Sequence, residues 1–185
     1  MVGFLTLQKA NKDAHVASYG GHTVIYTDGG CQTTPPFIGA YAFSIKTPAS
    51  GATMFATGTM LFTTNNRMEL MAIYKALEDA EIGPPIILYS DSMYAIQCLT
   101  EWGPSWVKKG WTTGEGKPVK NRELIEPLLM LVGLHTIEFK HVKGHAGNVG
   151  NTAVDELCVN AIKHANYDFH NDNIDHGISI DGVKV

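Results

Sequence analysis

The sequence has few cysteines and no long apolar run. Its three cysteines, Cys31, Cys98 and Cys158, are odd in number, lie far apart and form no CxxC pair. They therefore exclude a disulfide framework and a thiolate zinc site, and they suit a reducing compartment. No hydrophobic stretch approaches the roughly 20 residues that a membrane-spanning helix needs, and residues 1–15 lack the charged start and apolar stretch of a secretory signal. We therefore expect a cytoplasmic protein without membrane association.

The sequence also lacks an excess of basic residues. Its 14 Lys and Arg residues against 18 Asp and Glu residues give a formal net charge of −4. A nucleic-acid partner would therefore have to be bound by a local basic patch. With 44% hydrophobic and 17% charged residues, the chain is too apolar for global disorder, and its 185 residues suit one ordinary domain.

The hydrophobic periodicity predicts an α/β fold. Apolar or alternating runs predict strands over 22–30, 37–46, 52–61, 86–90 and 135–142. Helical spacing predicts helices over 65–81, 92–100, 122–132 and 154–165, with irregular structure over 102–120. Thr64, Asn65 or Asn66 can cap the first helix, and Asn121 can cap the third, in which Pro127 predicts a kink. This order predicts an antiparallel meander followed by parallel crossovers.

Four carboxylates occupy positions where a site could form. Asp28 lies near the end of the first predicted strand, and Asp91 directly follows the strand over 86–90. Glu69 lies in the first turns of the helix over 65–81, and Asp155 lies early in the last helix. Ligands gather at the carboxyl ends of strands in an α/β sheet. Each residue alone has a simpler interpretation, as a partner of the helix dipole or as a turn former.

Convergence of these carboxylates would create a cation site. Their mutual repulsion would raise their pKa values unless cations were bound. Carboxylate oxygens without cysteine or paired histidine select Mg²⁺ or Mn²⁺ rather than zinc. Two such ions about 4 Å apart are the usual arrangement for phosphodiester cleavage.

Four short blocks carry the most specific motifs. They read YTDGGC at 26–31, TTNNRMEL at 63–70, YSDSMY at 89–94, and HVKGHAG at 141–147 followed by Asn151 and Asp155. In this order, and spanning about residues 22–166, they resemble the four motif blocks of type 1 ribonuclease H. A segment that resembles the basic handle of the bacterial type contains Trp102, Trp106, Lys108, Lys109, Gly110 and Trp111.

The resemblance implies a fold, a division of the chain and an activity. The fold would be RNase H-like, with a mixed five-stranded sheet of three antiparallel strands and then two parallel ones, flanked by helices. The chain would comprise a short N-terminal extension (1–20), a catalytic domain (21–166) and an acidic C-terminal tail (167–185). A monomer would bind RNA/DNA hybrids and hydrolyse the RNA strand endonucleolytically, leaving 5′-phosphate and 3′-hydroxyl ends. The implied cofactors are two Mg²⁺ ions, with Mn²⁺ as a substitute.

The resemblance also implies roles for individual residues. Asp28, Glu69, Asp91 and Asp155 would bind the metals and catalyse the reaction. His145, in a glycine-flanked loop, would shuttle a proton or aid product release, because histidine titrates near neutral pH. His141 keeps a structural role. The residues expected to contact the substrate are Thr64, Asn65, Asn66, Ser92, Trp106, Lys108, Lys109 and Asn151.

The handle, defined as residues 105–123, is a local basic patch in a chain whose net charge is negative. It contains five basic and two acidic residues, a local net charge of +3. Basic charge beside flat aromatic rings suits contact with the phosphates and sugars of one strand, although a solvated loop packed over its tryptophans would share this composition. We expect Trp102 to pack, and Trp106 and the lysines to face nucleic acid.

Two positions depart from the family pattern. Thr34 stands where the bacterial members usually have an amide, and Met93 stands where a glutamine often contacts the substrate. Both departures concern contacts with substrate and not the carboxylates.

Two other functions fit part of the pattern. A DNA-cutting enzyme of the same fold, such as a transposase, integrase or junction resolvase, would share the carboxylates, but the TTNNRMEL block and the handle belong to the ribonuclease pattern. A hybrid-binding module without activity would not need all four carboxylates, and all four are present.

Overall fold

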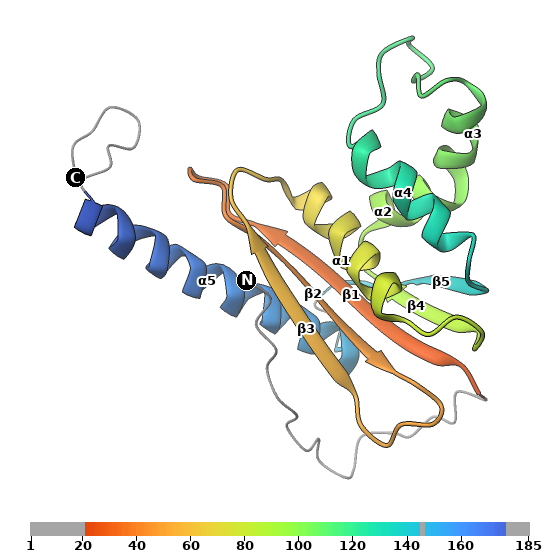
Figure 1. Cartoon of the computed structure of the whole chain (residues 1–185), viewed down its shortest axis with the longest axis horizontal. Coiled ribbons are helices and arrows are strands. Elements are labelled where there is room, and N and C mark those ends of the chain that lie inside the picture. Colours follow the sequence, from red (N-terminus) through yellow and green to blue (C-terminus); the bar gives the residue numbers. More distant parts are fainter. Residues whose placement is uncertain (1–20, 145–146, 177–185) are drawn as a thin grey trace.

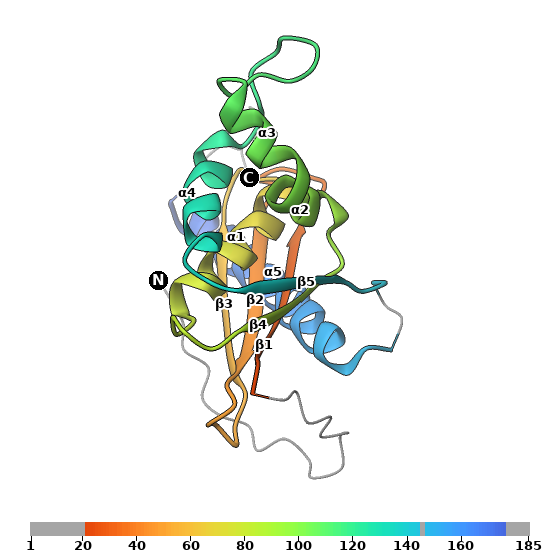
Figure 2. The same cartoon turned by 90° about the vertical axis from the view of Figure 1, so that its right-hand side faces the viewer.

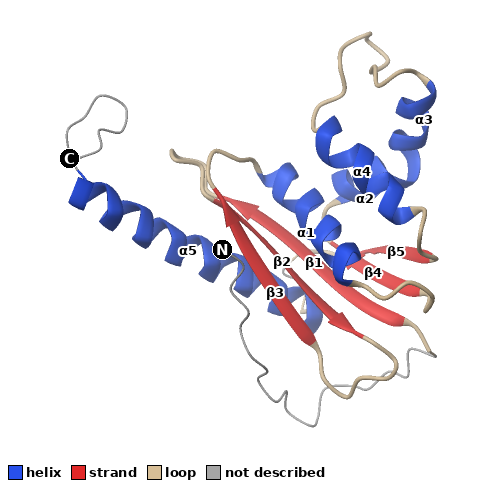
Figure 3. Ribbon diagram, in the orientation of Figure 1, coloured by secondary structure: helices blue, strands red, loops and turns tan. Residues whose placement is uncertain are grey.

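A five-stranded mixed sheet forms the centre of the molecule. The computed structural model describes residues 21–144 and 147–176. The strands are β1 (Thr23–Cys31), β2 (Gly39–Lys46), β3 (Met54–Met60), β4 (Ile86–Ser90) and β5 (Ile137–His141). Their order in the sheet is β3-β2-β1-β4-β5 (Figures 1 and 3). The pairs β1–β2 and β2–β3 are antiparallel, whereas β1–β4 and β4–β5 are parallel. The sheet therefore has the predicted antiparallel meander followed by parallel crossovers.

Helices cover both faces of this sheet. They are α1 (Asn65–Asp79), α2 (Met93–Gln97), a π-helical turn η1 (Cys98–Trp102), α3 (Gly103–Lys108), α4 (Arg122–Val132) and α5 (Val149–His176). Figure 2 shows α1 and α4 on one side of the sheet and α5 on the other. Thr64 is the N-cap of α1, because its hydroxyl accepts a hydrogen bond from the backbone nitrogen of Arg67 at 3.4 Å.

Two apolar clusters hold these layers together. The larger packs α1, α2 and α4 against the sheet through fully buried residues such as Ile25, Leu70 and Leu128. Burial of each such side chain contributes about 1.5–3 kcal/mol. The smaller cluster contains Ala40 and Ala42, whose small side chains let α5 lie close to the sheet. β1 is thus enclosed from both sides, which places its side chains in a low-dielectric interior.

The helical segment after β4 differs from the prediction. It continues through η1 and α3 to Lys108, although residues 102–120 were expected to be irregular. The Gly103–Pro104 pair predicts the interruption of a helix. Pro104 instead lies in the first turn of α3, where its missing N–H is not needed. The Gly103 N–H bonds to the carbonyl of Cys98, five residues back, which forms the π turn.

The last two helices also correct details of the prediction. α4 has the predicted bounds, but the Asn121 side chain does not cap it; Asn121 is left-handed, with φ of 58°. α5 begins before 154 and runs to His176, because no glycine or proline interrupts the sequence between Gly150 and Gly177. Figure 1 shows α5 continuing past the edge of the sheet. Residues 167–176 of the expected tail are therefore helical, whereas 1–20 and 177–185 lie outside the described residues.

Two further observations concern the cysteines and the helices. Cys31, Cys98 and Cys158 are all free. Within residues 21–144 and 147–176, no helical segment combines the length and the hydrophobicity that a membrane span requires.

Candidate active site

A contact between two backbones brings the first two carboxylates together. Gly29 follows Asp28 in β1 and lies against α1, where a Cβ atom would stand 2.2 Å from the backbone nitrogen of Glu69. Only glycine allows β1 and α1 to approach this closely. Asp28 and Glu69 are both buried, at 7% and 6% exposure.

Asp91 completes an acidic cluster. It directly follows β4, which runs parallel to β1 and ends at the same edge of the sheet. Asp28, Glu69 and Asp91 each offer a carboxylate oxygen, and these three oxygens lie within 4.8 Å of one another. The structure thus brings together three of the four predicted metal ligands. Asp155, on α5, is not a member of this group of three, but its charge acts on Asp28.

The cluster shifts the ionisation of its own members. Burial raises the pKa of Asp28 to about 6, with further increases from the negative charges of Asp91 and Asp155. Burial also holds the pKa of Glu69 well above its usual range, and Asp28 and Asp91 add to that effect. The backbone N–H of Gly29 opposes both shifts. Asp28 and Glu69 are therefore costly to ionise unless a cation balances their charge.

Buried oxygens on Glu69 and Asn151 have no hydrogen-bond partner among the described residues, and the first of them belongs to this cluster. Glu69 Oε2 and Asn151 Oδ1 are buried and accept no hydrogen bond from the described part of the chain. A buried acceptor without a partner costs free energy that a bound cation would offset. Asn151 is only 3% exposed and lies one turn before Asp155 in α5. An all-oxygen donor set of this kind fits Mg²⁺ or Mn²⁺.

The last residue of β5 and the segment that follows it lie against Asp91. His141 Nε2 lies 3.2 Å from the backbone carbonyl oxygen of Asp91, a main-chain contact that suits the structural role predicted for it. A Cβ atom at Gly144 would stand 2.8 Å from Asp91 Oδ2, so that glycine keeps space beside the carboxylate. In the sequence, the signal for Gly144 is its place in the KGHAG block. His145 lies outside the described residues.

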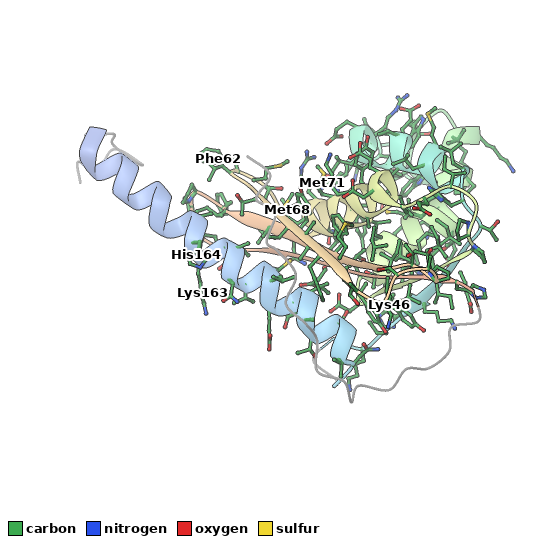
Figure 4. All side chains as sticks on the ribbon, turned by 60° about the horizontal axis from the view of Figure 1, so that its bottom comes forward. Lys46, Phe62, Met68, Met71, Lys163 and His164 are labelled. Carbon is green, nitrogen blue, oxygen red and sulfur yellow. The ribbon has the colours of Figure 1, made fainter. Side chains whose placement is uncertain are left out.

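The substrate residues predicted at the start of α1 are accessible. Thr64, Asn65 and Asn66 are exposed on the turn that leads to Glu69. Figure 4 shows the neighbouring Phe62 standing out from the molecule, whereas Met68, in the next turn, is fully buried. Ser92 is half-buried, and its hydroxyl accepts a hydrogen bond from the Ala95 backbone nitrogen at 3.2 Å, so it caps α2.

One tryptophan of the handle is more covered than expected. Trp106, which was expected to face nucleic acid, is half-buried and packs against the larger core cluster. Trp102, just before the handle, is 36% exposed and contacts the Tyr94 and Trp106 rings, so it packs as expected. The cover over Trp106 follows from the helical course of η1 and α3, which the sequence did not predict. Trp111 is buried, with the Arg122 guanidinium 5.0 Å from its ring centre.

The handle lysines point to solvent. Lys108 and Lys109 are exposed at the end of α3, and none of the ion pairs among the described residues uses either of them. Figure 1 shows α3 and the loop that follows it projecting away from the sheet. Both amines are therefore available to a polyanion.

Comparisons with known proteins agree with this site. The RNase H family model matches residues 21–163. Ribonuclease H of Paracidovorax citrulli is 44% identical over 137 residues, which cover 73% of this chain and 90% of that protein. Ribonuclease HI of Pseudomonas aeruginosa is 42% identical over 135 residues, which cover 73% of this chain and 89% of that protein.

Solved structures show the same fold at lower sequence identity. A type 1 RNase H with the type 2 active-site motif superposes with a TM-score of 0.69 at 23% identity, covering 78% of this chain and 73% of that one. The foamy viral protease-reverse transcriptase in complex with RNA/DNA hybrid superposes with a TM-score of 0.70 at 18% identity, covering 85% of this chain and 22% of that one. Since the family model and the curated ribonucleases H match most of its length, the chain belongs to the RNase H family.

Proposed function

We propose that this chain is an endonuclease that hydrolyses the RNA strand of RNA/DNA hybrids with the help of two divalent cations, Mg²⁺ by preference. The observation that carries this proposal is the cluster of the buried Asp28 and Glu69 with the half-buried Asp91, which is strongly acidic and rich in oxygen ligands. Membership of the RNase H family supplies the reaction class, phosphodiester hydrolysis.

Asp28, Glu69, Asp91 and Asp155 would hold the cations. When bound, the cations activate water and stabilise the leaving oxygen. The oxygen of water attacks phosphorus, the bond from phosphorus to the 3′ oxygen breaks, and the products carry a 5′-phosphate and a 3′-hydroxyl. The 3′ oxygen must receive a proton, and we assign its delivery to His145, which follows Gly144 in the sequence.

The chemistry itself does not require a 2′-hydroxyl, so recognition has to select the substrate. Asn65 and Asn66 are exposed beside the helix turn that holds Glu69, and their amides can bind the 2′-hydroxyls or base edges in the shallow minor groove of the hybrid. Lys108 and Lys109 can bind the phosphates of the DNA strand. Recognition would thus use two surfaces, one for each strand.

One gel experiment tests this proposal. Labelled RNA/DNA hybrid, duplex RNA and duplex DNA of one sequence are incubated with the protein in Mg²⁺ or in EDTA. We expect RNA-strand cleavage of the hybrid in Mg²⁺ alone, at least ~10³-fold faster than cleavage of either duplex, as when unpaired polar groups reject a wrong substrate. End-labelling of the products checks for a 5′-phosphate. Comparable cutting of duplex DNA would favour a DNA nuclease and overturn the proposal.

A further inference from the structure

A set of polar contacts joins the catalytic helix to the handle. Arg67 lies on α1 between Asn66 and Glu69, and its guanidinium forms an ion pair with Glu123 in the first turn of α4. The same Nη1 atom donates a hydrogen bond to Asn121 Oδ1 at 3.4 Å. The guanidinium lowers the pKa of the Glu123 carboxyl, in agreement with a direct contact. Arg67 thus connects α1 to the C-terminal end of the handle.

The contacts continue from Asn121 to the other end of the handle. Its amide nitrogen donates a hydrogen bond to the Tyr94 hydroxyl at 3.0 Å. The Tyr94 ring meets the Trp102 ring edge-on, with centroids 6.2 Å apart, and Trp102 in turn contacts Trp106 at 5.8 Å. Lys108 and Lys109 follow Trp106 directly at the end of α3. Both ends of the handle are therefore fixed by one contact network that begins at Arg67.

The backbone of Asn121 adopts a conformation that suits its place in this network. Its φ of 58° lies in the left-handed region, which asparagine adopts more readily than most other non-glycine residues. Its side chain makes no capping bond to α4 and instead contacts Arg67 and Tyr94. The turn from the handle into α4 is therefore held by tertiary contacts and not by local helix capping.

We infer that Arg67 is a positioning residue: through Glu123 and Asn121 it holds the handle at a fixed place relative to the acidic cluster. The inference rests on the proposed function, because the handle lysines and the carboxylates would bind the two strands of one hybrid. Loss of the network would leave the carboxylates intact and weaken the handle's share of binding. The fold would survive, because an exposed ion pair contributes little to stability and the Glu123 side chain is 61% exposed.

A charge-matched pair of variants isolates this role. Glu123→Gln removes the partner of Arg67. Glu126→Gln removes one negative charge from the same helix, where Glu126 forms an ion pair with Arg122. Both variants change the net charge by the same amount, so general electrostatic effects on nucleic-acid binding are equal. KM and kcat are measured on a long hybrid that reaches the handle and on a short one that does not.

We expect Glu123→Gln to raise KM on the long hybrid about three- to tenfold relative to Glu126→Gln. Its kcat should stay within twofold, and both variants should behave alike on the short hybrid. In a double-mutant cycle, Lys108→Ala with Lys109→Ala should weaken binding less in the Glu123→Gln background than in wild type. Equal losses in the two backgrounds, with an active wild type, would overturn this inference alone. A wild-type protein that leaves the hybrid intact would overturn the proposed function and this inference with it.

Discussion

Replacing Asp28 by asparagine should stabilise the cation-free protein at neutral pH. The structure raises the pKa of Asp28 from its ordinary value of 3.8 to about 6, chiefly through burial and secondly through Asp91 and Asp155. At 1.36 kcal/mol per pH unit, this difference corresponds to about 3 kcal/mol of unfolding free energy. Asparagine has nearly the same size and no charge, so it removes the electrostatic cost without creating a cavity.

The sign of the effect follows from where the proton is held more tightly. The folded state keeps the Asp28 proton up to about pH 6, whereas the unfolded chain releases it near 3.8. The stabilising contribution of the protonated group is therefore fully present below pH 3.8 and is lost as the pH rises through about 6. The raised pKa of Glu69 acts in the same direction.

Urea unfolding followed by circular dichroism between pH 4 and 8 measures this difference. In EDTA, wild type and Asp28→Asn should be equally stable near pH 4, and the variant should be more stable by up to about 3 kcal/mol at pH 7.5. Mg²⁺ should then stabilise wild type at pH 7.5 much more than the variant. Parallel stability curves for the two proteins in EDTA would refute this electrostatic account of the cluster.

Three other changes test separate parts of the molecule. Asp91→Asn should abolish cleavage in a Mg²⁺ assay while leaving hybrid binding largely intact, because a neutral amide of similar size is a poor Mg²⁺ ligand; turnover within tenfold of wild type would contradict its role as a ligand. Lys108→Ala combined with Lys109→Ala should flatten the slope of log K against log salt by roughly one to two, and an unchanged slope would mean that both amines only face solvent. Gly29→Ala should lower the unfolding free energy by about 1–3 kcal/mol, because the Cβ of the new alanine would meet the Glu69 backbone. Gly51→Ala, where a Cβ meets nothing within 4 Å, is the control, and equal stability of the two variants would contradict the close contact.

The sheet could be predicted because its signals are local. The run IILYS has the length and apolar character of a buried strand, and β4 has its predicted bounds of Ile86–Ser90. Asp28 lies near the end of one apolar strand and Asp91 directly follows another, so the sequence supported the hypothesis that they converge. The parallel pairing of β1 and β4 brings both to one edge of the sheet. The approach of Glu69 from α1 depends on Gly29, whose role could be derived only once both backbones were placed.

The handle could not be predicted to the same depth, because its structure depends on contacts distant in sequence. Gly103 and Pro104 are helix breakers by local rules, yet the chain continues from a π turn into α3. The partial burial of Trp106 follows from this path and from its packing against the core. Composition shows that the handle is basic and aromatic, but not which rings are covered.

The same backbone contact that builds the site also makes it dependent on a counter-charge. Gly29 lets β1 and α1 approach until Asp28 and Glu69 are buried together, and burial is the main cause of both raised pKa values. Moving these carboxylates outward would relieve the repulsion, but it would also lose the low-dielectric surroundings in which charges interact strongly. The repulsion and burial of these carboxylates therefore destabilise the folded protein in its cation-free form. Cation binding would offset part of this loss of folding free energy. For this reason stability and activity should respond to divalent cations through the same carboxylates.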